Sequence, residues 1–189
     1  MRNIITSGIE NNLSLMEEIK DDFIPLIEDI SLAIIERIKA GGTIYWCGNG
    51  GSAGQAQHLS AELVGGYYSH DRPPIASVSL TTDTSMITAW ANDTDFDSIF
   101  SRQLEALGKP EDVLIGLSTS GNSANVLRAF QTARGKSILT IAFTGQSGGA
   151  LKSHADMILN IPCKDTPRIQ EAHLLVGHIL CEIIEKQFS

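Results

Sequence analysis

Four hydroxyl side chains surround one glycine in the segment STSGNS, which joins an apolar run to a helical pattern. The run at residues 113–117 is typical of a strand buried on both faces, and it is followed by Ser118, Thr119, Ser120 and Ser123. One hydroxyl is enough to cap a helix, whereas several hydroxyls beside the free N–H groups of a helix N-terminus suit an anion. The pattern favours a loop that holds the phosphate of a sugar. The alternative is a serine cap in an ordinary loop.

His58 and Glu62 form a second candidate group, in a helical pattern at residues 55–63 that follows the glycine-rich loop GNGGSA. Their i, i+4 spacing places both side chains on one helix face, about 6 Å apart along the axis. Such a pair can hold one metal ion or present a base and an acid to one substrate. The alternative is a polar pair on the protein surface.

The last helical pattern, at residues 168–186, contributes His178 among apolar neighbours. A lone histidine in such a place is more often a hydrogen-bonded core residue than a catalyst. His173 is ambiguous and would replace His178 if the register of the helix differed. His70 and His154 lie in polar loops and are expected at the surface.

Short apolar runs alternate with helical patterns from residue 43 onward, which predicts an α/β fold. We expect a three-layer α/β/α sandwich whose five-stranded, mainly parallel sheet is flavodoxin-like. Ligands of such folds bind beyond the carboxyl ends of the strands, where the loops described above lie. The expected strands are 43–47, 75–80, 113–117, 138–143 and 157–161, and the helical patterns lie near 53–64, 85–91, 97–107, 123–134 and 168–186.

Residues 1–40 form a helical prefix to the domain expected at residues 41–189. Pro25 cannot lie deep inside a helix without cost, so we expect two helices with a break near residues 22–24. The prefix packs either between subunits or on the sheet of its own chain. Its apolar stripe consists of Ile9, Leu13, Met16, Ile19, Phe23, Ile27, Ile30, Ile34 and Ile38.

Composition limits the class of protein. The 189 residues carry a net charge of −8 without any basic run, which argues against nucleic-acid binding. The three cysteines, Cys47, Cys163 and Cys181, lie in apolar segments and are expected to be reduced thiols. No segment approaches the roughly 20 apolar residues of a membrane span, and none resembles a signal peptide. We therefore expect a cytoplasmic protein that binds no membrane.

Several motifs together resemble the phosphoheptose isomerase family, whose substrate is sedoheptulose 7-phosphate. STSGNS and the glycine-rich loop mark the wider class of sugar isomerase (SIS) domains, whereas His58, Glu62, Gln170 and His178 are a more specific set. The resemblance runs from about Gly42 to the C-terminus. The motifs are CGNGGSA, AQHLSAEL, TTDTS, ANDTDFDSIFSRQ, GLSTSGNSANV and RIQEAHLLVGHIL.

The resemblance implies roles at matching positions. Glu62 and His178 would be the acid and base of an aldose–ketose isomerisation, which yields D-glycero-D-manno-heptose 7-phosphate as the first step of heptose synthesis for lipopolysaccharide. The protein would be a homotetramer with sites between subunits. A zinc ion would be bound by His58, Glu62, Gln170 and His178. The phosphorylated seven-carbon sugar would be bound by Asn49, Gly50, Gly51, Ser52, Glu62, Asn92, Asp93, Ser118, Thr119, Ser120, Ser123 and Gln170.

The chemistry of the reaction also assigns two roles. A proton moves between adjacent carbons through an enediolate, and protons must also move on the oxygens. Glu62 is the better base at carbon, His178 can serve the oxygens, and a metal would polarise the carbonyl. On one straight helix Gln170 and His178 would be about 12 Å apart, so either Gln170 precedes the helix or the ligands come from more than one chain.

The chain departs from the family pattern at two positions. Gln55 replaces an aspartate, and Gly66 replaces a basic residue at the end of the first helix of the domain. The second change implies either a related phosphosugar or a substitute cation such as Arg72 or Arg102. The competing functions are a non-catalytic SIS-domain binding protein of the bacterial replication initiator, which lacks the carboxylate and imidazole, and a phosphosugar-sensing regulatory domain.

Overall fold

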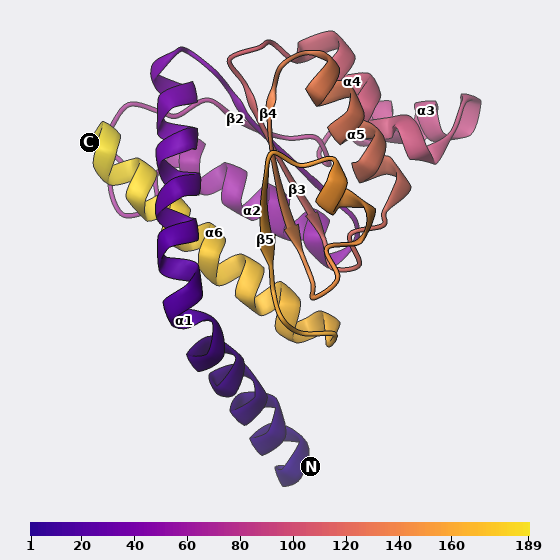
Figure 1. Cartoon of the computed structure of the whole chain (residues 1–189). Coiled ribbons are helices and arrows are strands. Elements are labelled where there is room, and N and C mark those ends of the chain that lie inside the picture. Colours follow the sequence, from indigo (N-terminus) through magenta and orange to yellow (C-terminus); the bar gives the residue numbers. More distant parts are fainter.

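A single parallel sheet of five strands forms the centre of the computed structural model, which describes residues 1–189 (Figure 1). The strands lie in the order β2-β1-β3-β4-β5. β1 and β3 are in register from Ile44 opposite Val113 to Gly48 opposite Leu117. This order confirms the predicted flavodoxin-like sheet. The strands are β1 (Ile44–Gly48), β2 (Ser77–Ser79), β3 (Val113–Ser118), β4 (Leu139–Thr144) and β5 (Met157–Asn160).

Helices cover both faces of the sheet. Those packed on one face are α1 (Arg2–Lys39), α2 (Gly51–Gly65) and α6 (Thr166–Phe188), and those packed on the other are α4 (Ile99–Leu107) and α5 (Ala124–Gly135). The helix α3 (Thr84–Asp93) and the short turns η1 (Phe96–Ser98) and η2 (Gly149–Ser153) complete the chain. None of the helices combines the length and apolar character that crossing a membrane would require.

Alternation along β1 divides the core into two layers. All five residues of β1 are buried. Trp46 packs with residues of α1, α2 and α6, whereas Tyr45 and Cys47 pack with residues of α4 and α5. Because successive side chains of a strand point to opposite faces, a strand with two buried faces must be apolar throughout. The three-layer α/β/α sandwich is thus confirmed.

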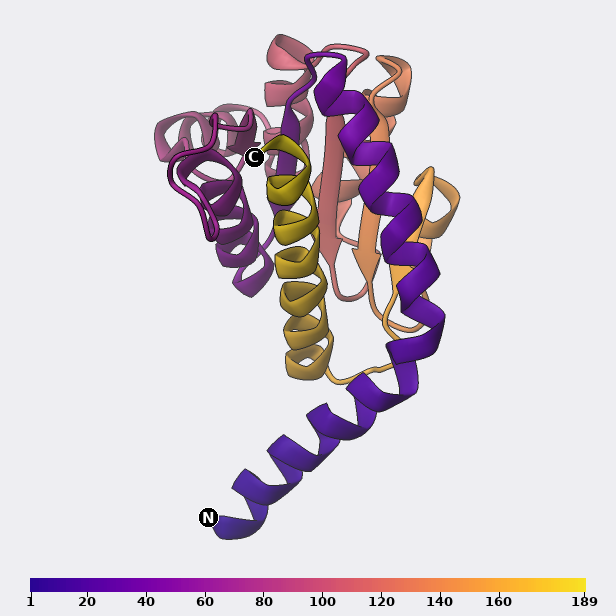
Figure 2. The ribbon, with the colours of Figure 1, turned by 90° about the vertical axis from the view of Figure 1, so that its left-hand side faces the viewer.

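The prediction of two helices in the prefix is wrong, because α1 is one helix of 38 residues that contains Pro25. Proline frees the carbonyl four residues earlier, at Asp21, and both residues are exposed, so water can serve that carbonyl. Instead of ending there, the helix bends part way along its length (Figure 2). Its second half is buried through Ile27, Ile30 and Ile34.

The second strand is shorter than the predicted residues 75–80, because β2 spans only Ser77–Ser79. The N–H of Ile75 donates to the carbonyl of Leu63 at 3.2 Å, which commits it to the end of α2 and not to the sheet. The other strands and helices begin and end within a few residues of the predicted positions.

Candidate active site

The two predicted ligand loops are neighbours, because β1 and β3 pair in parallel and both loops follow their carboxyl ends. Asn49, after β1, and Asn125, at the start of α5, exchange two amide hydrogen bonds of 2.9 and 2.8 Å. Asn49 is therefore engaged in joining the loops. Asn125, which the sequence analysis did not identify, is 2% exposed and also accepts a bond from the N–H of Val126. The pair fixes the spacing of the two loops.

The hydroxyl loop places its side chains in different surroundings. Ser118 is buried, and its Oγ lies 2.9 Å from Oγ of Ser123. Ser120 is exposed, and its Oγ accepts a bond from the N–H of Asn122. Gly121 adopts φ +68° at a position where a Cβ would come within 2.1 Å of the carbonyl oxygen of Gly148. Glycine is therefore needed to fold this loop against its neighbour.

The N-terminus of α5 remains available to a ligand. Ser123 is its N-cap residue, yet its side chain makes no capping hydrogen bond to the helix. Asn125 takes the N–H of Val126, but the N–H groups of Ala124 and Asn125 lack a side-chain partner, which is the arrangement that favours an anion. Thr119 and Ser120 also line a cavity of about 380 Å³. The rest of its lining is Gln146, Ser147, Cys163, Lys164, Thr166 and Ile169.

A close crossing of α2 and α6 positions the second group. At Gly177 a Cβ would come within 2.5 Å of Cδ1 of Leu59, so a side chain there would force Leu59 to shift and would widen this approach. The thiol of Cys181 contacts the carbonyl of Leu59 at 3.8 Å, one turn further along α6. On α2, Ala56, Leu59 and Leu63 are fully buried, at helical spacing. The crossing therefore brings His178, which follows Gly177, directly over α2.

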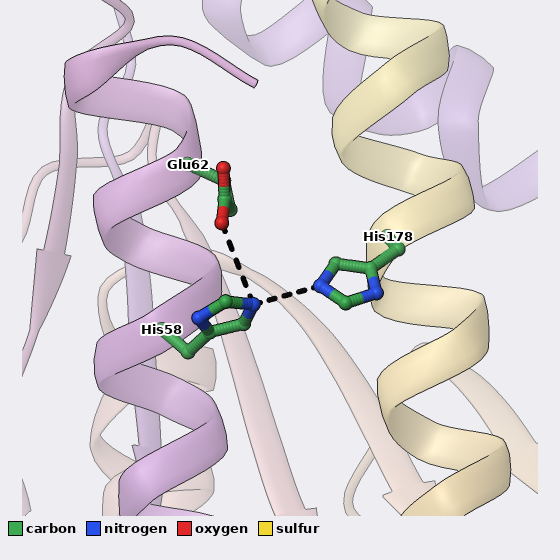
Figure 3. A group of neighbouring side chains, drawn as sticks. All are labelled: His58, Glu62 and His178. Atoms are coloured by element: carbon green, nitrogen blue, oxygen red, sulfur yellow. Dashed lines mark hydrogen bonds and ion pairs between the residues drawn. The ribbon is translucent and has the colours of Figure 1, made fainter. Parts of the chain in front are cut away.

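His58, Glu62 and His178 come together at this crossing (Figure 3). Nε2 of His58 lies 2.7 Å from Nε2 of His178 and 3.4 Å from Oε1 of Glu62. The three potential ligand atoms all lie within 4.8 Å of one another. The predicted acid and base, and three of the four predicted metal ligands, thus form one cluster within a single chain.

The electrostatics of the cluster keep His178 neutral. Desolvation lowers the pKa of His178, and nearby His58 lowers it further, against the opposing effect of the Glu62 carboxylate. Two imidazole nitrogens at 2.7 Å either share one proton or face a common cation. Two imidazoles and one carboxylate are a donor set that zinc accepts in catalytic sites. The residues therefore fit a metal ion chemically.

Gln170 lies apart from this cluster. It is within α6, and not before the helix, eight residues ahead of His178, which corresponds to about 12 Å along an α-helix. A Cβ on Gly51 would come within 2.7 Å of Nε2 of Gln170, so this side chain covers the start of α2. Gln55 donates to the carbonyl of Gln170 at 2.6 Å. Within one chain, the side chain of Gln170 therefore lies at the start of α2, near Gly51 and Ser52, and not at the histidine cluster.

Asn92 and Asp93 lie at the end of α3, which protrudes from the body of the molecule (Figure 1). α3 has no buried residue. The amide of Asn92 donates to Asp93 at 2.7 Å, and both side chains are exposed. One chain therefore leaves these two predicted substrate contacts at an exposed tip.

The ambiguity of His173 is resolved by its burial. Its side chain is fully buried, and its Nε2 lies 3.1 Å from the carbonyl of Thr144. Burial lowers its pKa to about 4, against a smaller effect of the bond to Thr144, so it is a neutral core residue. His70 is exposed and His154 is half-buried in contact with the carbonyl of Ala150, consistent with the surface positions expected for them.

Both arginines proposed to replace the missing cation at Gly66 have partners elsewhere in the chain, and only Arg72 is buried by them. Arg72 is buried and donates to Glu185, Pro73 and Glu62. Arg102 stacks over Trp90 at 4.8 Å and pairs with Glu105 at the surface.

Gly66 itself has φ +116°, and a Cβ there would come within 2.5 Å of the carbonyl oxygen of Ser69. The local turn as folded here therefore requires glycine at position 66.

Comparisons of the sequence and of the structure with known proteins point to the same family. The SIS domain family model matches residues 9–145. The phosphoheptose isomerase of Sulfurimonas denitrificans is 46% identical over 189 residues, covering 99% of this chain and 96% of that protein. The structure of phosphoheptose isomerase GmhA from Neisseria gonorrhoeae has a TM-score of 0.92 at 38% identity, covering 98% of both chains. A phosphoheptose isomerase from Francisella tularensis gives 0.94 at 36% identity, covering 97% of both.

Proposed function

The chain belongs to the phosphoheptose isomerase family of SIS-domain proteins and is a phosphosugar isomerase, and from this we propose that its substrate is sedoheptulose 7-phosphate. The product would be D-glycero-D-manno-heptose 7-phosphate, a precursor of the heptose of lipopolysaccharide. The observation that carries the proposal is the convergence of Glu62 and His178 at one crossing of two helices. The non-catalytic relative considered above lacks both side chains, so their convergence favours an enzyme.

Glu62 and His178 divide the proton transfers. The Glu62 carboxylate removes the proton from the carbon next to the carbonyl and returns it to the adjacent carbon, through an enediolate. His178 is neutral because its pKa is lowered, so it can accept a proton from a hydroxyl and deliver it to the carbonyl oxygen. The two residues come from different helices, which lets them act on different atoms of one substrate.

The hydroxyl loop holds the far end of the sugar. We assign phosphate binding to Ser118, Thr119, Ser120 and Ser123, with the N–H groups of α5 as further donors. Asn49, Gly50, Gly51 and Ser52 would line the adjacent side, where Gln170 covers Gly51. Binding energy from the phosphate then orients the reacting carbons, which are remote from it.

Zinc is the metal that we propose for the cluster. His58, Glu62 and His178 would hold it, and when bound it would polarise the substrate carbonyl. Gln170 is part of α6, so it would reach this position only from a second copy of the chain. That requirement agrees with a site shared between subunits.

We further propose that the protein is a homotetramer in which residues 1–40 form much of the contact between subunits. Ile4, Ile5, Ile9 and Leu13 of α1 are 57–78% exposed, although they form an apolar stripe. The exposed tip that carries Asn92 and Asp93 would likewise contribute to the site of a neighbouring subunit.

The test is to incubate the protein with sedoheptulose 7-phosphate and follow the sugar by NMR, with and without a chelator. Appearance of the aldose signals would support the proposed reaction, and their loss on chelation with return on added zinc would support the metal. A protein that binds the sugar without converting it would contradict the proposal.

A further inference from the structure

One buried carboxylate binds the segment of chain that follows α2 and holds its backbone in place. Glu185, on α6, is 4% exposed and accepts hydrogen bonds from the N–H groups of Tyr67, Tyr68 and Ser69 at 2.7, 2.8 and 3.0 Å. A fourth bond, at 2.8 Å, comes from Nε of Arg72. Desolvation would raise the pKa of Glu185, but these bonds outweigh it and lower the pKa to about 2. The carboxylate is therefore ionised and fully engaged.

Arg72 connects Glu185 to the backbone of Glu62. Its Nη2 donates to the backbone carbonyl of Glu62 at 2.9 Å, and Nη1 donates to the carbonyl of Pro73. The Glu62 carbonyl also accepts the N–H of Gly66 at 3.1 Å. The last turn of α2 would otherwise have open carbonyls, so these bonds fix the segment of backbone that bears Glu62.

Tyr67 connects Glu185 to the imidazole of His178. Its ring lies 5.6 Å from the imidazole of His178, centre to centre, with the planes inclined by 33°. The backbone of Tyr67 is held by Glu185, which lies seven residues after His178 and so on the same face of α6. The ring therefore limits the orientation of the imidazole of His178.

We propose that Glu185, Arg72 and Tyr67 are positioning residues that hold both Glu62 and His178 in their reactive arrangement. The inference rests on the catalytic roles proposed above for those two residues. Glu185 acts on Glu62 through the guanidinium of Arg72 and on His178 through the ring of Tyr67. A single ionised group thus sets the spacing between a base on α2 and an imidazole on α6.

The chemistry of the cluster suits this role better than simple stabilisation. Bonds to an ionised acceptor are stronger and shorter than neutral ones, and the guanidinium donates in a fixed planar fork. Lysine at position 72 would keep the charge but could not reach Glu185, Glu62 and Pro73 in that geometry. The arrangement also explains why the turn contains Gly66, since a side chain there would displace the segment that Glu185 binds.

The experiment compares Arg72→Lys, Tyr67→Leu and Tyr67→Phe in the full-length protein. Misplacing a reactive group lowers turnover more than binding, so we expect kcat of the first two to fall about 10- to 100-fold while KM changes less than about threefold. Tyr67→Phe keeps the ring and should restore turnover. A folded Glu185→Gln variant should show the same fall in kcat. If that variant does not fold, Arg72→Lys and Tyr67→Leu decide the test.

Asp112→Asn is the matched control. Asp112 is another buried carboxylate that accepts backbone N–H groups, from Thr43 and Lys109, but neither of these partners belongs to α2, α6 or the segment that follows α2. The Asp112→Asn variant should have a lower melting temperature and a kcat within about twofold of wild type, because Asp112 touches no reactive group. Unchanged kcat in folded Arg72→Lys and Tyr67→Leu, or an equal loss in Asp112→Asn, would overturn the positioning role.

NMR of the imidazole of His178 separates this inference from the proposed function. Arg72→Lys and Tyr67→Leu should both move the C–H signal of His178, and Asp112→Asn should not. If the wild-type protein failed to isomerise the sugar, the proposed function would fail, while a moved signal would still support the positioning role. A signal that stays in place in both variants would refute that role.

Discussion

Two parts of the protein differ in how well they are buried within a single chain. They are the crossing of α2 and α6 and the first third of α1. At the crossing, Gly177 lies against Leu59 and Glu185 is buried with four donors. In α1, Ile9 and Leu13 are 58% and 63% exposed.

The difference separates two requirements. The groups proposed to exchange protons need placement within fractions of an ångström, and the chain's own packing holds them in place. The proposed contact surface for another copy needs only to be apolar and correctly shaped, and in that proposal it would remain exposed until the copy binds. Substitutions in the two regions should therefore affect different measurements.

Glu62→Gln should have the largest effect. The amide keeps the shape of the carboxylate but cannot remove a proton from carbon, so kcat should fall by about 10²- to 10⁴-fold. Sugar NMR measures turnover, and light scattering should give an unchanged mass. His178→Gln should behave in the same way. Near wild-type turnover in either variant would show that the residue is only a ligand or packing element.

Ser120→Ala should have the next largest effect. Losing one hydrogen bond to a charged phosphate costs about 1.5–3 kcal/mol, or roughly 10- to 150-fold in affinity. Calorimetric titration with the sugar phosphate measures the loss, and thermal unfolding should be almost unchanged because the side chain is exposed.

Ser153→Ala removes a hydroxyl from η2, outside the loop, and serves as the control for this affinity measurement. Equal affinities in wild type, Ser118→Ala and Ser120→Ala would contradict the assignment of the loop to phosphate.

Acid should weaken the packing around α6 through His173. Its folded-state pKa is lowered to about 4, so between that value and the ordinary value of 6.5 the unfolded chain binds a proton that the folded chain does not. Stability is thus lost as the pH falls through this range, by about 2 kcal/mol between pH 7 and pH 5.

Urea unfolding at both pH values measures this loss. His173→Gln should reduce the difference between the two, because glutamine does not titrate. An undiminished difference in that variant would place the acid sensitivity in another group.

Replacing Ile9 and Leu13 together by Glu should have the smallest effect on the chain itself. Both side chains are already exposed, so the free energy of unfolding of a single chain should change by about 0.5 kcal/mol or less. Assembly should nevertheless be lost, because four charges per pair of helices would face one another. Light scattering reports the mass, and a wild-type monomer at micromolar concentration would contradict the proposed contact.

The sheet and the hydroxyl loop could be predicted because their signals are local. Residues 113–117 are uniformly apolar, and the loop residues follow them directly, so strand and loop are both visible in a short segment. The joint position of His58 and Glu62 is equally local, since it follows from helical spacing alone.

The remaining features depend on contacts between distant segments. Pro25 predicts a helix break, but exposure of Asp21 and packing of the following turns keep α1 continuous. Arg72 was considered as a substrate contact, yet Glu185, 113 residues later, turns it inward. The close approach at Gly177 has no local signal, because its cause is the side chain of Leu59 on another helix.

The crossing of α2 and α6 also imposes an order of events during synthesis. His58 and His178 are separated by 120 residues, which a ribosome adds in about 6–24 s at about 5–20 residues per second. Throughout that interval Leu59 and the apolar face of α1 lack the helix that will cover them. The nascent chain therefore carries this uncovered apolar surface before its last helix exists, and the proposed active site can form only after the C-terminal helix has left the ribosome.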